Sequence, residues 1–305
     1  MQALVIKSTG SWYEIKAENG HVHQARTKGK LRLSSESNTN PVAVGDNVKV
    51  QENPNGDFVI EGVLSRRNYL VRKSNNLSRK KQIIAANVDT LLLVVTLFQP
   101  RTSTGFIDRI LLNAEAYGIS SLLVFNKIDL LHGSDLELLN AYQEIYKQAG
   151  YETIEISALQ KKNLDQLKHK IAKQTSLITG HSGAGKSTLL NALLGGSIQK
   201  TDTISTFSNK GKHTTTFAEM FFLDDDTKII DTPGIKDFGV VDIEKHEVCQ
   251  YFKEFNKIAA KCRFHNCLHI EEPDCAVKHG LEDGSISSDR YINYLSIVNN
   301  EDVHH

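Results

Sequence analysis

The feature that most constrains the fold of this chain is a glycine-rich turn between a short apolar run and a helix-forming run. Residues 175–179 are largely apolar, residues 180–187 have the pattern G-x-x-x-x-G-K-S, and a helix-forming run continues to Leu194. Glycines let a backbone curl so that successive N–H groups point inward, and the following helix presents its positive end there. Strand, loop and helix in this order predict a phosphate-binding loop, and a chance glycine turn would lack these two neighbours.

The side chains of this loop have distinct expected roles. Lys186 is expected to contact the β- and γ-phosphates of a nucleotide, and the Ser187 hydroxyl is expected to bind Mg²⁺. The remaining residues are expected to surround the phosphates, and they are Gly180, His181, Ser182, Gly183, Ala184, Gly185 and Thr188.

A second polar turn, N-K-x-D at residues 126–129, follows the run 121–125, which is predicted to be a buried parallel strand. The turn therefore lies at the carboxyl end of a strand, where open α/β sheets bind their ligands. The Asp129 carboxylate can accept hydrogen bonds from N1–H and the exocyclic amine of guanine, a pair of donors that adenine lacks on that edge. A site built around such donors rejects an analogue without them by roughly 10⁴-fold or more. The expected nucleotide is therefore GTP.

Four further residues are expected around the base. The stem of Lys127 can lie along the base, and Asn126 can tie the base loop to the phosphate loop. Ser157 and Ala158 follow the alternating segment 153–156 and can offer backbone N–H groups to the guanine carbonyl.

A third turn, D-T-P-G at residues 231–234, also follows a short apolar run. Asp231 is placed to hold Mg²⁺ through water, and the Gly234 N–H is placed to sense the γ-phosphate. Thr215 is the expected hydroxyl that closes over Mg²⁺ in the triphosphate state, with Thr214 and Thr216 as alternatives.

The residue that would position the attacking water is less obvious. Many GTPases carry a glutamine just after the D-x-x-G turn, and here that position holds Ile235, so intrinsic hydrolysis is expected to be slow. His213 is the nearest group able to orient or deprotonate water and is the expected catalytic residue beside Lys186 and Thr215. A solvated loop histidine is the alternative, because the chain has 12 histidines.

The order of these stretches is rotated. The base motif and Ser157-Ala158 come first, the phosphate loop follows, and the threonines and the D-x-x-G turn come last. An ordinary GTPase begins with the phosphate loop, so the order predicts a circularly permuted GTPase.

A second strong pattern lies in the C-terminal third, where three cysteines and one histidine have the spacing C-x4-C-x-H-x5-C. Three thiolates and one imidazole form a closed tetrahedral set for Zn²⁺, which favours a structural site over a catalytic one. The expected ligands are Cys262, Cys267, His269 and Cys275. His265 is a rival ligand, and unrelated free cysteines are the alternative.

The cysteines and the overall composition indicate the cellular compartment and the class of protein. Only Cys249 lies apart from the cluster, and it is expected in the core or in a helix. We find no signal peptide and no apolar run long enough to cross a membrane, so a reducing cytoplasm is expected and metal is favoured over disulfides. The chain of 305 residues has 24% charged residues and a net charge of zero, so it is no polycation. A monomer satisfies every feature of the sequence.

The predicted organisation is multidomain. The first segment contains short alternating runs separated by turn residues, which favours a small antiparallel barrel of the OB-fold type. The predicted units are an OB-fold RNA-binding barrel at 1–67, a basic linker at 68–84, a permuted α/β GTPase domain at 85–240 and a mainly helical zinc-binding domain at 241–305. Amphipathic helices are expected at 106–116 and 136–148.

Basic residues on the predicted barrel could follow a nucleic-acid backbone. Lys28, Lys30 and Arg32 lie close together in sequence, with Arg26 nearby. A solvated barrel face explains any single one of these residues equally well.

Together, the small barrel, the permuted motif order and the cysteine-histidine segment resemble the bacterial ribosome small-subunit-dependent GTPase A family. The most specific stretches are residues 180–187, 211–216, 231–234 and the zinc segment, and the similarity covers nearly the whole chain. The resemblance implies late maturation of the 30S subunit, with 16S rRNA as a partner and GTP hydrolysis stimulated by the subunit and used for release. Because the net charge is zero, binding to ribosomal RNA would depend on local basic patches.

Two other classes of function remain as alternatives. One is an ATP-using P-loop enzyme in which the N-K-x-D turn is fortuitous, and competition between GTP and ATP distinguishes it. The other is an RNA-binding regulator for which GTP is a switch and hydrolysis is incidental. A turnover rate that no ribosomal particle changes would favour the regulator.

Overall fold

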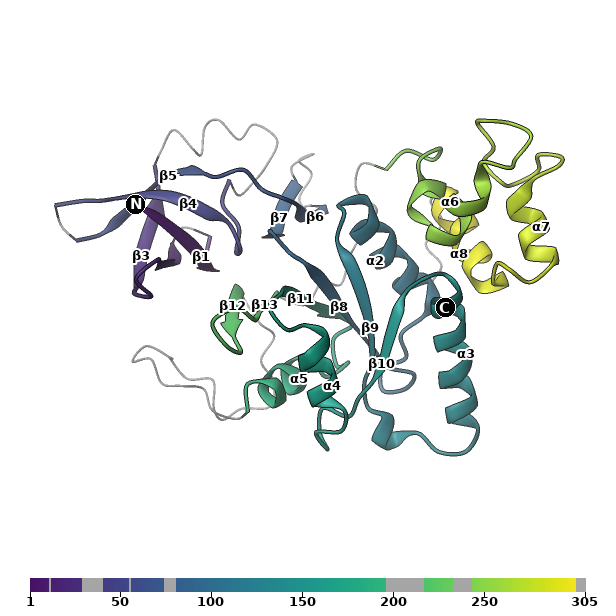
Figure 1. Ribbon diagram of the computed structural model, residues 1–305, viewed down its shortest axis with the longest axis horizontal. Coiled ribbons are helices and arrows are strands. Elements are labelled where there is room, and N and C mark those ends of the chain that lie inside the picture. Colours follow the sequence, from purple (N-terminus) through teal and green to yellow (C-terminus); the bar gives the residue numbers. More distant parts are fainter. Residues whose placement is uncertain are drawn as a thin grey trace.

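The computed structural model describes residues 1–10, 12–28, 41–54, 56–73, 81–195, 217–232 and 243–299. Within these ranges the chain forms a five-stranded barrel, a central α/β part and a C-terminal helical module. Figure 1 shows the barrel and the helical module on opposite sides of the central part.

The barrel has the strand order β1-β2-β3-β5-β4, and β4 also pairs with β1, which closes it. Alternate side chains point inward, as in β2, where Tyr13, Ile15 and Ala17 are buried and the residues between them are partly exposed. The order agrees with the predicted OB-fold, a five-stranded Greek-key barrel. The strands are β1 (Gln2–Ser8), β2 (Tyr13–Ala17), β3 (Val22–Thr27), β4 (Asn47–Glu52) and β5 (Phe58–Val63).

Two strands lie where the polar composition predicted a linker. β6 (Tyr69–Lys73) and β7 (Lys81–Ala86) form a two-stranded antiparallel sheet. Leu70 and Ala85 are fully buried, and both belong to the main cluster of the central part. Parts of the predicted linker therefore form strands, because a few apolar residues in a largely charged segment pack into the core.

The central part is a sheet in the order β10-β9-β8-β11-β13-β12. The first five strands are parallel, and β12 runs antiparallel to β13. The strands are β8 (Thr90–Val95), β9 (Ser120–Phe125), β10 (Glu152–Glu155), β11 (Thr175–Gly180), β12 (Ala218–Phe222) and β13 (Lys228–Asp231).

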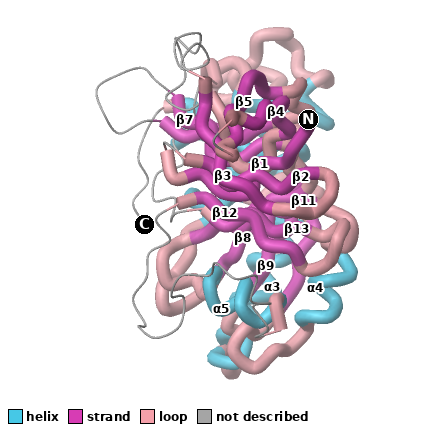
Figure 2. The backbone as a smooth tube through the Cα atoms, turned by 90° about the vertical axis from the view of Figure 1, so that its left-hand side faces the viewer, coloured by secondary structure: helices cyan, strands magenta, loops and turns pink. Residues whose placement is uncertain are grey.

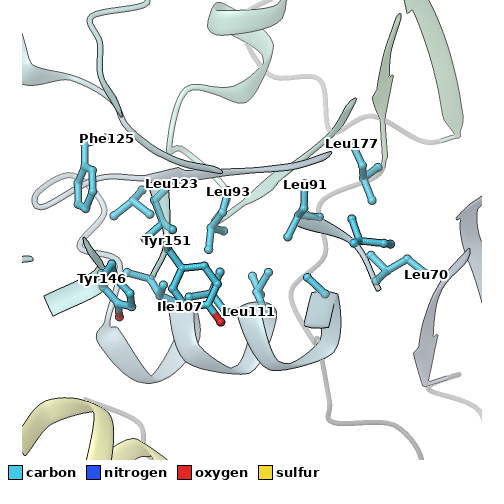
Figure 3. Close-up of a cluster of buried hydrophobic side chains, with 14 of the residues drawn as sticks. Leu70, Leu91, Leu93, Ile107, Leu111, Leu123, Phe125, Tyr146, Tyr151 and Leu177 are labelled. Carbon is cyan, nitrogen blue, oxygen red and sulfur yellow. The ribbon is translucent and has the colours of Figure 1, made fainter. Parts of the chain in front are cut away.

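Helices cover both faces of this sheet, as Figure 1 shows. Leu91 and Leu93 of β8 face α2, where they pack with Ile107 and Leu111 (Figure 3). Leu92, between them, points to the other face, which α4 and α5 cover. Strands buried on both faces read as continuous apolar runs, as β8 does. The helices are α2 (Thr104–Ala116), α3 (Ser134–Gln148), α4 (Leu164–Lys170) and α5 (Lys186–Leu193).

The two predicted amphipathic helices are present as α2 and α3, and each begins two residues earlier than expected. For α2 the reason is a cap, because the Ser103 hydroxyl accepts a hydrogen bond from the Phe106 N–H at 3.3 Å.

The barrel and the central sheet form one continuous sheet of 11 strands, because β1 pairs with β12. Lys7 lies opposite Glu219, and their side chains form a salt bridge of 3.1 Å. A second junction lies at Ala86, whose N–H donates to the Val44 carbonyl at 2.9 Å. Figure 2 shows the barrel strands continuing into those of the central part.

The C-terminal module consists of short helices around an aromatic core. Phe252, Phe255 and Tyr294 are buried there, and Leu112 of α2 joins the same cluster. The module therefore packs on the central part through α2. Its elements are η2 (Val248–Tyr251), α6 (Lys253–Ala259), α7 (Ala276–Glu282) and α8 (Ser288–Val298).

None of the helices in the described ranges combines the length and the apolar character that crossing a bilayer requires.

Candidate functional site

The glycine-rich loop connects β11 to α5, as the sequence predicted. Two of its glycines are required by close contacts and by a positive φ. A Cβ on Gly180 (φ 144°) would lie 2.4 Å from the Val94 carbonyl oxygen, and one on Gly185 (φ 93°) would lie 2.4 Å from Nδ2 of Asn126. Any side chain would force these neighbours apart, so the loop conformation depends on both glycines.

Lys186 lies across this loop. Its Nζ donates to the carbonyl oxygens of Gly180 and His181, both at 2.8 Å. Burial lowers the pKa of the ammonium group, and the Asp231 carboxylate opposes this shift. The lysine is thus held inside the loop, where phosphate oxygens can replace the two carbonyl groups. Ser187 and Thr188, the next residues of α5, are exposed.

Asn126 joins three loops. Its Nδ2 donates to the Ala184 carbonyl at 2.9 Å, and its Oδ1 accepts from the Ala158 N–H at 3.0 Å. The side chain is almost fully buried. One amide therefore ties the N-K-x-D turn to the phosphate loop, as the sequence predicted, and also to the turn that contains Ser157 and Ala158.

The other residues of the base turn are more accessible. Lys127 has a left-handed backbone (φ 66°) and donates its Nζ to the Gln99 carbonyl. Asp129 lies in the short helix η1 (Ile128–Leu130) and is partly exposed. Ser157 is buried, and its hydroxyl accepts from the Gln160 N–H at 3.0 Å.

A segment that the motifs did not identify, residues 96–103, lies against the phosphate loop. A Cβ on Gly183 would lie 3.2 Å from Cδ of Pro100. The Thr96 hydroxyl donates to the Pro100 carbonyl at 2.6 Å and so shapes this segment. This segment directly follows β8 and so lies at the carboxyl end of a central strand. That position could have predicted its place in the site, because open α/β sheets bind ligands there.

His181 contacts the start of α2. Its ring stacks on Phe106 with the centroids 3.7 Å apart and an interplanar angle of 23°. Burial lowers the pKa of the imidazole, and the Lys186 ammonium lowers it further. The phosphate loop therefore has a neutral aromatic contact with α2 at neutral pH.

Asp231 ends β13 beside the phosphate loop, because its register partner on β11 is Ile178. Its side chain is buried, and its charge acts on Lys186. The Ser187 hydroxyl and the Asp231 carboxylate are hard oxygen donors of the kind that Mg²⁺ prefers, so these residues fit the ion. Other predicted site residues lie outside the described ranges, and these are His213, Thr214, Thr215, Thr216 and Gly234.

The four predicted metal ligands come together in the C-terminal module. One ligand atom from each of Cys262, Cys267, His269 and Cys275 lies within 4.8 Å of all the others. The His269 Nδ1 lies 3.6 Å from the Cys262 sulfur and 3.4 Å from the Cys275 sulfur. This donor set fits a tetrahedral Zn²⁺ ion. His265, the rival ligand, is exposed and lies outside the group.

The loop that carries this cluster is held by outer hydrogen bonds. The Tyr291 and Tyr294 hydroxyls donate to the carbonyl oxygens of His269 and Leu268, both at 2.8 Å. Burial lowers the pKa of His269, which keeps its imidazole neutral, as a metal ligand must be. Burial also raises the pKa of the Cys267 thiol to about 12, so binding of a metal must displace a proton.

Cys249, expected in the core or in a helix, is a buried residue of η2. Its sulfur lies 3.0 Å from Nε2 of His269. No sequence pattern predicts this contact, because 19 residues separate the two positions.

Comparison with known families identifies the chain. The sequence profile of the family described as RsgA GTPase matches residues 63–241, more than half of the chain, and the profile described as RsgA N-terminal domain matches residues 2–60. The chain belongs to the RsgA GTPase family. It is therefore a GTP hydrolase, as the nucleotide motifs predicted.

Relatives of the RsgA family match over nearly their whole length. The small ribosomal subunit biogenesis GTPase RsgA of Christiangramia forsetii is 50% identical, and the match covers 99% of this chain and 97% of that protein. The protein described in the same words from Flavobacterium johnsoniae is 48% identical over 100% of this chain and 95% of its own.

Two crystal structures share the RsgA architecture. YjeQ from Thermotoga maritima has a TM-score of 0.78 and 32% identity and covers 100% of this chain and 99% of its own. YloQ, described as a circularly permuted GTPase, has a TM-score of 0.74 and 25% identity, with coverage of 98% and 94%. The permuted order and the fold class predicted from the sequence are confirmed.

Proposed function

We propose that this protein binds the 30S ribosomal subunit and acts late in its maturation, with GTP hydrolysis stimulated by the subunit and used for release. The observation that carries the proposal is the likeness, at 50% identity over 99% of the chain, to a protein described as a small ribosomal subunit biogenesis GTPase. The nucleotide site supports it, because Asn126 already connects the base turn and the phosphate loop.

The nucleotide chemistry is assigned to the residues that the sequence singled out. Asp129 selects guanine, Asn126, Ser157 and Ala158 shape the base pocket, and Lys186 balances the phosphate charge. Mg²⁺, bound by Ser187 and through water by Asp231, supplies further charge neutralisation at the phosphates.

The residues assigned to hydrolysis and switching lie outside the described ranges and rest on the sequence alone. Thr215 is assigned to close over Mg²⁺, and the Gly234 N–H is assigned to sense the γ-phosphate. His213 is assigned to orient the attacking water. Loss of stimulated turnover in His213→Ala, with GTP affinity unchanged, is the expected result; unchanged stimulated turnover would remove the assignment.

The two flanking parts are proposed to contact 16S rRNA. On the barrel, the guanidinium of Arg26 lies over the Trp12 ring at 3.5 Å from its centroid, and Arg26 and Lys28 are exposed. An exposed cation beside an aromatic ring suits single-stranded RNA, which proteins bind by charge and stacking. Lys30 and Arg32 lie outside the described ranges.

The C-terminal module is proposed to hold one structural Zn²⁺ through Cys262, Cys267, His269 and Cys275. The ion supplies a cross-link to a small part of the chain that has a modest core of its own. The protein is proposed to act in the cytoplasm as a monomer.

Both flanking parts contact the core near the nucleotide site. The barrel is joined to β12, which lies in sequence between residues 214–216 and Asp231. The helical module packs on α2, whose Phe106 stacks on His181 of the phosphate loop. We infer that ordering of the switch residues by GTP sets the angle between barrel and module, and that this angle determines subunit binding.

Sedimentation with ribosomal subunits tests the proposal. The protein is mixed with 30S or 50S particles in the presence of a non-hydrolysable GTP analogue, GDP, or an ATP analogue, at one fixed salt concentration. The proposal predicts co-sedimentation with 30S in the GTP analogue, weaker binding in GDP, and no effect of the ATP analogue. Equal binding to both particles in every nucleotide would contradict it.

A further inference from the structure

The ring of His269 lies between two groups of sulfur atoms. On one side, Nδ1 faces the Cys262 and Cys275 sulfurs at 3.6 and 3.4 Å. On the other side, Nε2 faces the Cys249 sulfur at 3.0 Å. Because the two ring nitrogens point in different directions, the Cys249 sulfur lies outside the four-atom cluster.

The protonation of the ring follows from this placement. A neutral imidazole has one nitrogen with a lone pair and one with a hydrogen. The nitrogen that faces the ligand cluster, Nδ1, must present its lone pair to a metal, so the hydrogen lies on Nε2. The Nε2–H then points at the Cys249 sulfur, which can accept it.

The backbone contacts of His269 do not fix the ring by themselves. The Tyr291 hydroxyl holds the His269 carbonyl, and the residue has a left-handed backbone (φ 60°). Rotation about the side-chain bonds could still exchange the two nitrogens. Among the described contacts of this ring, the one made by Nε2 is with Cys249, on the side away from the cluster.

We propose that Cys249 is a positioning residue for the metal centre: its sulfur accepts the Nε2–H of His269 and fixes the ring with Nδ1 toward a soft divalent cation such as Zn²⁺. The inference rests on the metal centre proposed above. Hydrogen bonds to the second nitrogen of a ligating histidine commonly orient the ring and strengthen the ligand.

The same contact joins the metal loop to a different element. Cys249 lies in η2, and η2 packs with α2 in the cluster that contains Leu112 and Val248. In sequence, η2 is the first described element after Asp231 and Thr232. Cys249 therefore connects the metal centre to the chain that leaves the nucleotide site.

Zinc transfer to a chromogenic chelator tests the proposal on the full-length protein. Cys249→Ala removes the acceptor, and Cys249→Ser retains a smaller one. Val248→Ala is the matched control, because Val248 is buried in the same η2 and its side chain has no atom that can accept the Nε2–H. Loss of an outer-shell partner costs roughly 10–100-fold in metal affinity, and this is the loss expected for Cys249→Ala. Cys249→Ser should recover part of the loss, and Val248→Ala should remain near wild type.

Nitrogen-15 NMR of the His269 ring supplies a readout that a general loss of packing would not reproduce. In the zinc-loaded wild type and in Val248→Ala, we expect a metal-bound Nδ1 and an Nε2–H protected from solvent exchange. In Cys249→Ala we expect rapid exchange of that hydrogen.

Two results would overturn the proposal. One is wild-type zinc affinity and an unchanged Nε2–H signal in Cys249→Ala. The other is equal loss of zinc in Cys249→Ala and Val248→Ala, which would show a packing role alone. Stimulation of GTP turnover by 30S is measured separately, so failure of this inference leaves the proposed ribosomal function standing.

Discussion

At the scale of single residues, Asn126 holds the loops of the candidate nucleotide site together. It connects three loops that lie at the ends of three different strands, through two hydrogen bonds of 2.9 and 3.0 Å in a buried position. Preorganised loops cost less to order when the ligand binds. Asn126 is therefore expected to contribute to affinity even where it makes no contact with the nucleotide.

Replacement of Asn126 by alanine tests this role. Asn126→Ala leaves the Ala184 carbonyl and the Ala158 N–H without their partner, and each such loss costs about 1–3 kcal/mol. GTP affinity is expected to fall by roughly 10–100-fold, which corresponds to about 1.4–2.8 kcal/mol, because only part of that cost falls on the nucleotide-bound conformation. Titration with a fluorescent GDP or GTP analogue measures it.

Asn191→Ala is the matched control, because Asn191 is an exposed asparagine of the neighbouring helix α5. It should bind as tightly as the wild type. An affinity of Asn126→Ala equal to that of Asn191→Ala would show that the loops hold their positions without this amide.

Sequence motifs predicted single residues of the candidate sites better than they predicted contacts between residues. Asn126, Lys186 and the cluster of three cysteines and one histidine follow from short patterns, because the chemistry expected of them fixes residue type and spacing. The stacking of Phe106 on His181 and the contact of Cys249 with His269 have no such pattern. Both join residues that are distant in sequence, so only the packing of the chain brings them together.

At the scale of elements, α2 links the phosphate loop to the C-terminal module. Its first turn carries Phe106, which stacks on His181. Its next residues include Asp108, a fully buried carboxylate that accepts from Arg290 of α8 at 2.6 Å. Arg290 also donates to Glu254 of α6 at 2.7 and 3.0 Å. One buried arginine therefore joins three helices.

Removal of this arginine is expected to loosen the module. Arg290→Met leaves two buried carboxylates without their counter-ion, and breaking a buried pair in this way costs about 3–5 kcal/mol. The single tryptophan, Trp12, lies in the barrel, so its fluorescence would not report on the module. Hydrogen exchange of α6 and α8, followed by mass spectrometry, measures the effect directly and should be faster in the variant.

Arg263→Met is the control for Arg290→Met. Its salt bridge with Asp274 is well exposed on both sides, 62% and 67%, and exposed pairs contribute about 0–1 kcal/mol. Its exchange should match the wild type. If Arg290→Met also matched it, the buried network would not be what holds the module on α2.

Periodicity predicted the helices of this protein well, whereas composition predicted two of its strands wrongly. Helices α2 and α3 were predicted within two residues, because amphipathic periodicity is a strong signal over several turns. Strands β6 and β7 were expected as linker, since charged residues dominate their segment. They are short strands whose few apolar side chains, such as Leu70, complete a cluster formed by other parts of the chain.

At the scale of the whole molecule, the barrel and the central sheet are one structure through β1 and β12. Among the described residues, two register pairs join these strands, Lys7 with Glu219 and Ser8 with Ala218. A short junction of this kind can transmit a change in β12 to the barrel, and a single charge can weaken it.

Charge reversal tests the junction. Glu219→Lys removes an opposite-charge pair that contributes about 0.2–1 kcal/mol, and it places two like charges opposite each other, which destabilises the strand pair. Hydrogen exchange at the end of β1 should become faster, and the charge-swapped double variant, Lys7→Glu with Glu219→Lys, should restore it. Wild-type exchange in the single variant would mean that the Lys7–Glu219 charge pair does not hold the junction.

The proposed function requires that one ribosomal particle, the 30S subunit, stimulates GTP hydrolysis by this protein. The most direct measurement is GTP turnover by the purified full-length protein alone, with 30S subunits, and with 50S subunits, at one salt concentration. Slow turnover alone and strong stimulation by 30S but not by 50S is the predicted result. Turnover that neither subunit changes would contradict the ribosomal assignment and favour an RNA-binding regulator for which hydrolysis is incidental.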